Sequence, residues 1–365
     1  MTIIALDVMS GDLGAQECVP AALLALSGDA ELQLQLVGDA ALIERTLAAA
    51  GCTPKLRDRL QIVPASEVIL MTDAPREAIR RKKNSSMRIA VDLVQEGRAA
   101  AAVSAGNTGA LTAIAHFVLK CLPDVERAPI MSAVPNAQGH THLLDLGANV
   151  RATPLQLEQF AVMGAIVARD VHDIPRPRVG LLNIGSEESK GHDLVQDAHA
   201  RLRARAASGT GNIFEYRGFV EGQDIFGGEV DVVVTDGFTG NVALKTGEGT
   251  ARLIADFLRE AFNATILSKF AALLAMNALK RLRTRMDPRR SNGGVFLGLN
   301  GIVVKSHGSS DATGVAAAVD MAYKLARSGF RERLAARVAS AVVTGQGASE
   351  GAHLPAQDAG MGQPE

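Results

Sequence analysis

The sequence predicts an α/β protein built around a mostly parallel β-sheet. Short runs of Val, Ile, Leu and Ala, the pattern of buried strands, alternate with longer segments whose apolar residues recur at helical spacing. Four of these runs stop at polar loops rich in Gly and Asn, as strands do before a helix begins. Hydrophobic residues make up 47% of the 365 residues, which is enough for a sizeable core.

We expect strands and helices to alternate, because strand–helix–strand units build parallel sheets. The expected strands are Ile3–Asp7, Leu32–Val37, Leu60–Val63, Ala99–Ser104, Ile130–Val134, Leu143–Leu146, Val179–Ile184, Ile213–Gly218, Asp231–Thr235 and Gly301–Lys305. The expected helices are Val19–Leu26, Ala40–Ala50, Ile89–Glu96, Thr108–Leu119, Pro154–Val171, Asp193–Ala206 and Asn241–Phe262.

The chain shows neither an internal repeat nor a clear linker. We therefore expect one α/β catalytic domain over residues 1–344, with a helical excursion at about 255–292. Residues 345–365 are rich in Gly, Ala, Gln and Pro and predict a disordered C-terminal tail.

Composition narrows the classes of function. The formal net charge of −1 gives no general attraction to nucleic acid. Cys18, Cys52 and Cys121 are odd in number and widely spaced, which fits a reducing cytosol without disulfides. The chain enters a strand pattern at Thr2 without a signal peptide, and no apolar run reaches membrane-spanning length. We expect a cytoplasmic protein that is at most peripheral to a membrane.

The four polar loops predict a site that accepts an anion. They are Ser104–Ala110, Gly147–Val150, Asn183–Gly191 and Thr235–Lys245. Ligands of open α/β sheets bind beyond the carboxyl ends of the strands, so we expect all four loops to converge there. Glycine lets the backbone approach a ligand closely, and helix N-termini attract anions.

Two early loops carry candidate groups. Asp7 and Asp12 flank a Gly turn and can position a base or a phosphate-bound cation, although Asp12 as a helix cap is the favoured interpretation. Asn107 and Thr108 can cradle phosphate or an oxyanion at a helix start, or can simply cap that helix. The loop lacks the Gly-Lys-Ser/Thr of a Walker motif.

Two later loops carry lysines. Asn183 and Lys190 lie in a dense polar loop, where the lysine can hold phosphate or stabilise a thiolate; a solvated loop is the alternative. Asn241 and Lys245 are four residues apart and share one helix face behind Asp236, unless the lysine simply faces solvent.

The segment Lys305–Asp311 places Lys305, His307 and Ser309 after a late strand. A Ser–His–Asp triad is a weak interpretation, since triad members meet in space rather than in sequence. The preferred interpretation is that His307 shuttles a proton or donates a hydrogen bond to phosphate, and the alternative is that this segment is only a helix-capping turn. No further ligands accompany His140 and His142 at metal spacing, so we expect no metal.

Two basic stretches suggest binding surfaces. The first, at 76–88, includes four consecutive cations, Arg80, Arg81, Lys82 and Lys83. The second, Ile266–Arg290, begins apolar and ends basic. That pattern suits an anionic membrane surface, an acidic protein partner or a dimer interface, and the sequence does not choose among them.

With these loops in this order, the chain resembles the bacterial phosphate acyltransferase family, PlsX, also called acyl-[acyl carrier protein]:phosphate transacylase. The resemblance runs from about Thr2 to about Ala341. It rests on Ser104–Ala110, Leu143–Val150, Leu181–Gly191, Asp231–Lys245 and Gly293–Asp311. The family's usual opening Asp-Ala-Met-Gly-Gly-Asp here reads Asp7-Val-Met-Ser-Gly-Asp12, and the usual Lys-Lys-Asp-Ser-Ser has Asn84 in place of Asp.

The resemblance implies a cytosolic homodimer, peripheral to the membrane, with a Rossmann-like three-layer α/β/α core similar to phosphotransacetylases and isopropylmalate dehydrogenases. It implies that inorganic phosphate takes the acyl group from acyl carrier protein, giving acyl phosphate. A PlsY-type membrane acyltransferase then transfers the acyl group to glycerol 3-phosphate, at the entry to phospholipid synthesis.

This reaction suggests a role for each candidate residue. The expected catalytic residues are Lys190, Lys245, His307 and Asp236. The expected substrate- or phosphate-binding residues are Asp7, Asp12, Asn107, Thr108, Asn149, Asn183, Asn241, Lys305 and Ser309. Because the carrier protein is acidic, Arg80, Arg81, Lys82 and Lys83 are its first docking candidates, and residues 266–290 are the membrane contact. No cysteine lies in a polar loop, so we expect phosphate to attack the thioester directly, without a cofactor.

Three rival functions remain at this point. A phosphotransacetylase acting on acyl-CoA shares the chemistry and differs in the thiol carrier. A dehydrogenase of related fold would bind nicotinamide, and a non-catalytic membrane scaffold would bind vesicles without turnover.

Overall fold

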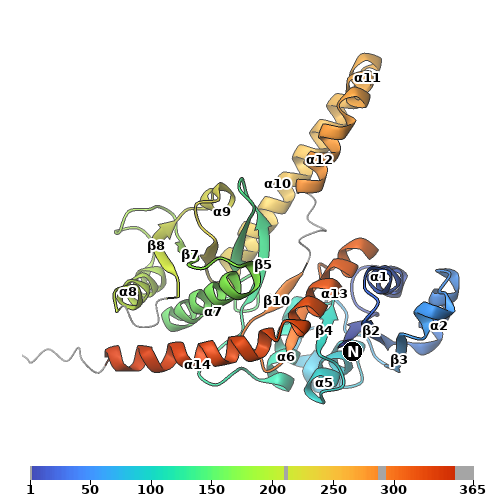
Figure 1. Cartoon of the computed structure of the whole chain (residues 1–365), viewed down its shortest axis with the longest axis horizontal. Helices are drawn as coiled ribbons and strands as arrows, with labels where there is room; N and C mark the ends of the chain where they lie inside the picture. Colours follow the sequence, from blue (N-terminus) through green and yellow to red (C-terminus); the bar gives the residue numbers. More distant parts are fainter. Residues whose placement is uncertain (1, 209–212, 287–292, 350–365) are drawn as a thin grey trace, which may run out of the picture.

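The computed structural model describes residues 2–208, 213–286 and 293–349 (Figure 1). The strands are β1 Thr2–Asp7, β2 Leu32–Gly38, β3 Leu60–Pro64, β4 Ala101–Ser104, β5 Ile130–Pro135, β6 His140–Leu144, β7 Arg178–Leu182, β8 Glu215–Val220, β9 Val232–Val234, β10 Gly294–Phe296 and β11 Ile302–Lys305. The helices are α1 Ala15–Gly28, α2 Ala40–Ala49, α3 Pro54–Arg57, α4 Pro75–Arg81, α5 Ser86–Gln95, α6 Thr108–Leu119, α7 Pro154–His172, α8 Asp193–Ala207, α9 Asp224–Gly227, α10 Gly237–Asn263, α11 Ile266–Leu274, α12 Met276–Met286, α13 Ala312–Arg327 and α14 Phe330–Ser349.

The strands form one sheet in the order β3-β2-β1-β4-β11-β10-β5-β6-β9-β7-β8. Pairing is antiparallel at β11–β10, β10–β5 and β5–β6, and parallel at the other recorded strand pairs. The prediction of a mostly parallel sheet is therefore confirmed. The sequence missed β10, whose three residues are too few to show a period. It also began β6 late, because the strand extends to His140 where it pairs with β5.

The three antiparallel steps reverse the strand direction between the two halves of the sheet. Strands β1, β4 and β11 run one way, and β6, β9 and β7 run the other. The expectation that all four polar loops converge along one edge was therefore wrong. It assumed an uninterrupted parallel sheet, whereas the β5–β6 hairpin turns the second half around.

Helices cover both faces of the sheet and give it three layers. Ile4 and Leu6 of β1 join a core with α1, α7, α8, α13 and α14. Ala5, which points to the opposite face because strand side chains alternate, joins a core with α5 and α6. The expected three-layer α/β/α class is confirmed. The buried Ala, Val and Leu residues of both faces belong to the apolar runs from which the strands and helices were predicted.

A helical arm projects from the body of the protein. Figure 1 shows the second half of α10, together with α11 and α12, extending away from the sheet, with α11 at the far end. Residues 287–290 of the expected membrane contact lie outside the described residues. Among the described helices, none is both long and apolar enough to cross a membrane.

The C-terminal segment differs from its expectation where it is described. Helix α14 continues to Ser349, so residues 345–349 are helical rather than part of a tail. Residues 350–365, the rest of the expected tail, lie outside the described residues.

Candidate active site

Three neighbouring parallel strands, β1, β4 and β11, end at the same edge of the sheet. Their loops are joined by backbone hydrogen bonds. Ser306 N donates to Ser104 O at 2.9 Å, and Asp12 N donates to Gly308 O at 2.8 Å. Gly11 has a φ of +92°, and a side chain there would come within 3.1 Å of Gly308 O. The three loops therefore form one continuous surface.

A buried carboxylate lies beneath this surface. Asp7, at the end of β1, is fully buried and accepts hydrogen bonds from Ser10 Oγ and from Ser104 Oγ, the latter at 2.7 Å. Burial raises the pKa of the Asp7 carboxyl above its usual value, and the serine hydroxyls oppose that rise. Asp7 is therefore a fixed acidic group behind the site rather than a group in its mouth.

Lys305, at the end of β11, interacts electrostatically with this carboxylate. Its Nζ donates to Ala105 O at 3.3 Å and to the carbonyl of Ser306. Burial lowers the pKa of Lys305 to about 8, and repulsion from Lys245 adds to that fall, while Asp12 and Asp7 oppose it. The ammonium is therefore poised to lose its proton close to neutral pH.

Lys245 reaches the same place from α10. The Nζ atom of Lys245 lies 2.7 Å from Nε2 of His307 and 3.3 Å from Oε2 of Glu248. The same Oε2 atom of Glu248 lies 3.7 Å from Nε2 of His307. Two cations do not share a 2.7 Å contact. Burial and then Lys245 lower the pKa of His307, and Glu248 opposes them. His307 is therefore neutral at neutral pH, with Nδ1 placed 2.8 Å from Ser309 Oγ.

Lys245 and His307 are 62 residues apart in sequence and come from opposite halves of the chain's sheet. Helix α10 makes this possible because it starts after β9 and runs about 1.5 Å per residue toward β11. The structure thus brings together Lys245, Lys305, His307 and Ser309, with Asp7 and Asp12 beside them. We call this group the lysine–histidine cluster.

The other predicted residues of the early loops have scaffold contacts. Asn107 caps α6 by accepting from Ala110 N at 3.0 Å, and its Nδ2 donates to the carbonyls of Met71 and Asp73. Thr108 is the first residue of that helix. Asn107 thereby ties the 71–73 loop to the site, and Met71 Cε approaches Gly308.

Residues near the start of α10 also hold the backbone. Asp236 is the N-cap of α10 and accepts from Thr239 N at 2.9 Å. Asn149 Nδ2 donates to Ala128 O at 3.0 Å and to the buried carboxylate of Asp145 at 2.9 Å. Asn241 is exposed and packs against Gly147.

Among the described residues, the loop after β7 shows no hydrogen bond or ion pair with the lysine–histidine cluster. Asn183 Nδ2 donates to the carbonyls of Gly185 and Lys190, each at 3.1 Å, so its amide closes its own loop. Lys190 is exposed. A catalytic role for Lys190 stays a prediction.

Sequence reasoning missed Ser10, Ser104 and Glu248. The serines occur in loops that were already singled out, and only their distance from Asp7 gives them a role. Glu248 stands one helical turn after Lys245, so the i, i+3 spacing was a usable signal.

The basic stretch at 80–83 divides in two. Lys82 Nζ forms an ion pair with Asp73 and donates to Val68 O at 2.8 Å, so it holds the neighbouring loop. Arg80, Arg81 and Lys83 are exposed. They remain available to an acidic partner.

Cys18 and Cys121 are poor nucleophiles in this structure. Burial raises the pKa of the Cys18 thiol to about 12 and that of Cys121 to about 11, so both stay protonated at neutral pH. Within the described ranges, no group of three or more His, Cys, Asp or Glu side chains is arranged to hold a metal ion.

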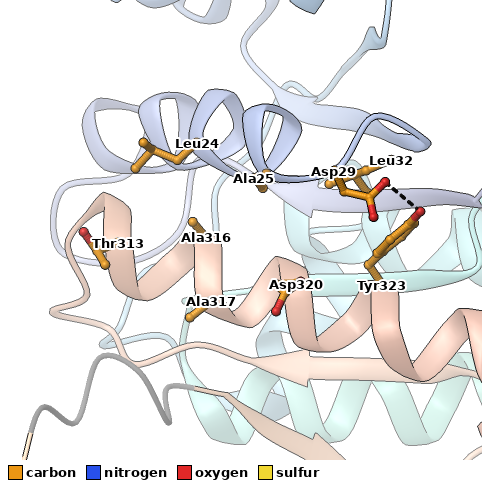
Figure 2. Close-up of a pocket in the computed structure, with 10 residues that line it drawn as sticks. Leu24, Ala25, Asp29, Leu32, Thr313, Ala316, Ala317, Asp320 and Tyr323 are labelled. Atoms are coloured by element: carbon orange, nitrogen blue, oxygen red, sulfur yellow. Dashed lines mark hydrogen bonds between the residues drawn. The ribbon is translucent and has the colours of Figure 1, made fainter. Parts of the chain in front are cut away.

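A separate groove of about 390 Å³ lies between α1 and α13 (Figure 2). It is lined by small and apolar residues such as Ala25 and Ala316, and Tyr323 Oη donates to Asp29 Oδ1 at 3.0 Å at one end. Its lining includes no member of the lysine–histidine cluster.

Comparison with known proteins identifies the family. Residues 2–333 match the family model described as "Fatty acid synthesis protein". A phosphate acyltransferase of Cereibacter sphaeroides is 50% identical over 350 residues, covering 95% of this chain and 94% of that protein. This chain belongs to the phosphate acyltransferase family. Its relatives of the same name in Paracoccus denitrificans and Methylococcus capsulatus are each 49% identical, covering 93% of this chain and 91% and 97% of theirs.

Solved structures support the fold. A Streptococcus pyogenes phosphotransacetylase superposes with a TM-score of 0.57 at 17% identity, covering 90% of this chain and 94% of that one. The EutD phosphotransacetylase of Staphylococcus aureus gives 0.56 at 15% identity with the same coverage. This chain therefore shares the fold of these two phosphotransacetylases.

Proposed function

We propose that this phosphate acyltransferase transfers an acyl group from the thioester of acyl carrier protein to inorganic phosphate, with the lysine–histidine cluster as its active site. The observation that supports this location is the 2.7 Å contact between Lys245 and His307, which brings together side chains 62 residues apart in the sequence. The products are acyl phosphate and the free carrier thiol.

The chemistry asks little of the protein beyond positioning and charge. Phosphate is already a nucleophile, so binding it against the thioester carbonyl supplies the proximity term. In this proposal Lys245 and Ser309 bind phosphate, and neutral His307, which contacts each of them through one ring nitrogen, orients both. Thr108, at the first turn of α6, is our candidate to stabilise the tetrahedral oxyanion.

One assay tests the reaction. Purified protein is mixed with palmitoyl-acyl carrier protein, with and without phosphate, and acyl phosphate is trapped with hydroxylamine. We expect thiol release that depends on phosphate, together with trapped hydroxamate. Release from acyl-CoA but not from the carrier protein would instead favour a phosphotransacetylase, and no release from either would favour a scaffold.

The exposed cations Arg80, Arg81 and Lys83 are our proposed docking surface for the carrier protein. An acidic partner is attracted to such a patch. The patch lies on and just after α4, and Asn107 joins the neighbouring 71–73 loop to the loop after β4.

The arm supplies the remaining contacts of the proposal. Phe257 and Leu253 on α10 are 60% and 51% exposed, and we propose that they pack against a second copy in a homodimer. Ile266 and Leu267 on α11 are 89% and 79% exposed, and we propose that this tip touches the membrane peripherally. A cytoplasmic enzyme placed there would deliver acyl phosphate to a PlsY-type membrane acyltransferase.

A further inference from the structure

The two clustered lysines are held in different ways. Lys305 Nζ donates to two backbone carbonyls, those of Ala105 and Ser306, and an ammonium has three donors. Among the residues that the structure describes, one N–H of Lys305 is therefore left for a ligand. Lys245 is 51% exposed, and it contacts side chains of His307 and Glu248 that can rearrange when an anion binds.

The charges around them differ as well. The groups that face Lys305 are Asp7 at the end of β1, Asp12 in the following loop, Lys245 on α10 and, in its own loop, His307. In the loop directly after β4, the carbonyl oxygen of Ala105 accepts a hydrogen bond from Lys305 Nζ. Asp7 and Asp12, the two acids near Lys305, would repel a phosphate dianion bound there. The leaving thiolate makes a different demand, because it forms only during the reaction and needs a single proton from a single donor.

Resting on the proposed function, we infer that Lys305 is the catalytic acid that protonates the departing thiolate, and that Lys245 binds the phosphate. A phosphate oxygen forms a bond to the thioester carbonyl carbon, and the carbon–sulfur bond breaks with its electron pair on sulfur. That sulfur takes the proton of the Lys305 ammonium. The resulting amine is protonated again from water.

The position of Lys305 suits a proton that is given up and regained in each cycle. Burial and the neighbouring Lys245 lower the pKa of Lys305 to about 8, close to the usual value of about 8.5 for a free thiol. General acids work best when their pKa lies near the pH at which the enzyme operates. A lysine that merely balanced phosphate charge would gain nothing from this tuning.

The test compares Lys305→Met and Lys305→Arg on palmitoyl-acyl carrier protein. We expect kcat to fall about 100-fold in both, with the KM for phosphate unchanged, because arginine keeps the charge but does not release its proton. The wild-type rate should decline as pH rises through about 8, and neither variant should show that limb. Recovery of the wild-type rate by Lys305→Arg, or a raised phosphate KM with normal kcat, would overturn the inference.

A change of leaving group gives a second readout. In an octanoyl thioester of 4-nitrothiophenol, the aryl thiolate leaves without being protonated, because thiols of low pKa are better leaving groups. With it, we expect Lys305→Met to be within a few-fold of wild type, whereas an equal loss on alkyl and aryl thioesters would contradict a proton-donor role. Lys55→Met, an exposed lysine on α3, is the matched control. A wild type that makes no acyl phosphate would contradict the proposed function itself.

Discussion

At the scale of single residues, the active site depends on charges that are forced close together. His307 stays neutral because it is partly buried and because Lys245 stands 2.7 Å from its ring. Glu248 opposes both effects. The three side chains therefore set one another's protonation, and each substitution moves the others.

This coupling makes the pH dependence testable. Removing a carboxylate disfavours the imidazolium, so Glu248→Gln should lower the pKa of His307 further. The neutral imidazole then persists to lower pH, and the acid limb of kcat/KM should move to lower pH. Glu260→Gln, an exposed change on the same helix, is the control and should not move the limb. A limb that moves upward in Glu248→Gln would contradict the assignment.

Asn149 separates a scaffold role from a catalytic one. Its amide donates to the buried Asp145 carboxylate and to Ala128 O. Asn149→Ala leaves both acceptors short of a donor and should lower the free energy of unfolding by about 1–3 kcal/mol. Denaturant unfolding measures the loss. Unchanged stability with kcat abolished would return Asn149 to the residues expected to bind the substrate or phosphate.

Spacing in the sequence singled out Lys245, Lys305 and His307, because each lies in a polar segment at or after the end of an apolar strand. It did not pair them, since a contact across 62 residues depends on the path of α10. It also listed Asn107, Asn149 and Asp236 beside them, because an amide or carboxylate after a strand looks the same whether it caps a backbone or binds a substrate.

At the scale of elements, α4 shows how one basic run carries two roles. Lys82 turns inward to Asp73, while its neighbours face solvent. A run of cations in the sequence cannot reveal this division, because it depends on where the 66–74 loop packs.

We expect the double variant Arg80→Glu/Lys83→Glu to raise the KM for acyl carrier protein about tenfold at low ionic strength, with kcat for a small octanoyl thioester unchanged. Added salt should narrow the difference, because exposed charges are screened. Lys55→Glu provides the control on a different helix. Steady-state kinetics decide the matter, and an unchanged KM for the carrier would move docking elsewhere.

At the scale of the whole molecule, the sheet reverses direction and the arm leaves the body. The alternation of strands and helices was enough to predict the α/β class and a mostly parallel sheet, whereas the three layers came from the family resemblance. The reversal was missed because β10 is too short to show a period, and because the short connection between the β5 and β6 segments was not used as a sign of antiparallel pairing. The arm was predicted as an excursion since its apolar and basic residues have no place in a compact core.

The tip of the arm makes a prediction about membranes. Leu267→Glu/Phe270→Glu removes two exposed apolar side chains of α11 and adds negative charge. Flotation with vesicles of anionic phospholipid should recover wild type and lose most of this variant, with kcat on soluble substrates retained. Equal recovery of both proteins would exclude α11 as the contact. Leu24→Glu, an exposed apolar position on α1, is the control and should float like wild type.

The most direct measurement of the central claim is the phosphate dependence of hydroxamate formation in Lys245→Met. If the lysine–histidine cluster binds the attacking phosphate, this variant should raise the KM for phosphate at least about tenfold, since it removes a charged hydrogen-bond donor worth about 1.5–3 kcal/mol. Lys55→Met should match wild type. An unchanged phosphate KM and kcat in Lys245→Met would place phosphate binding outside this cluster.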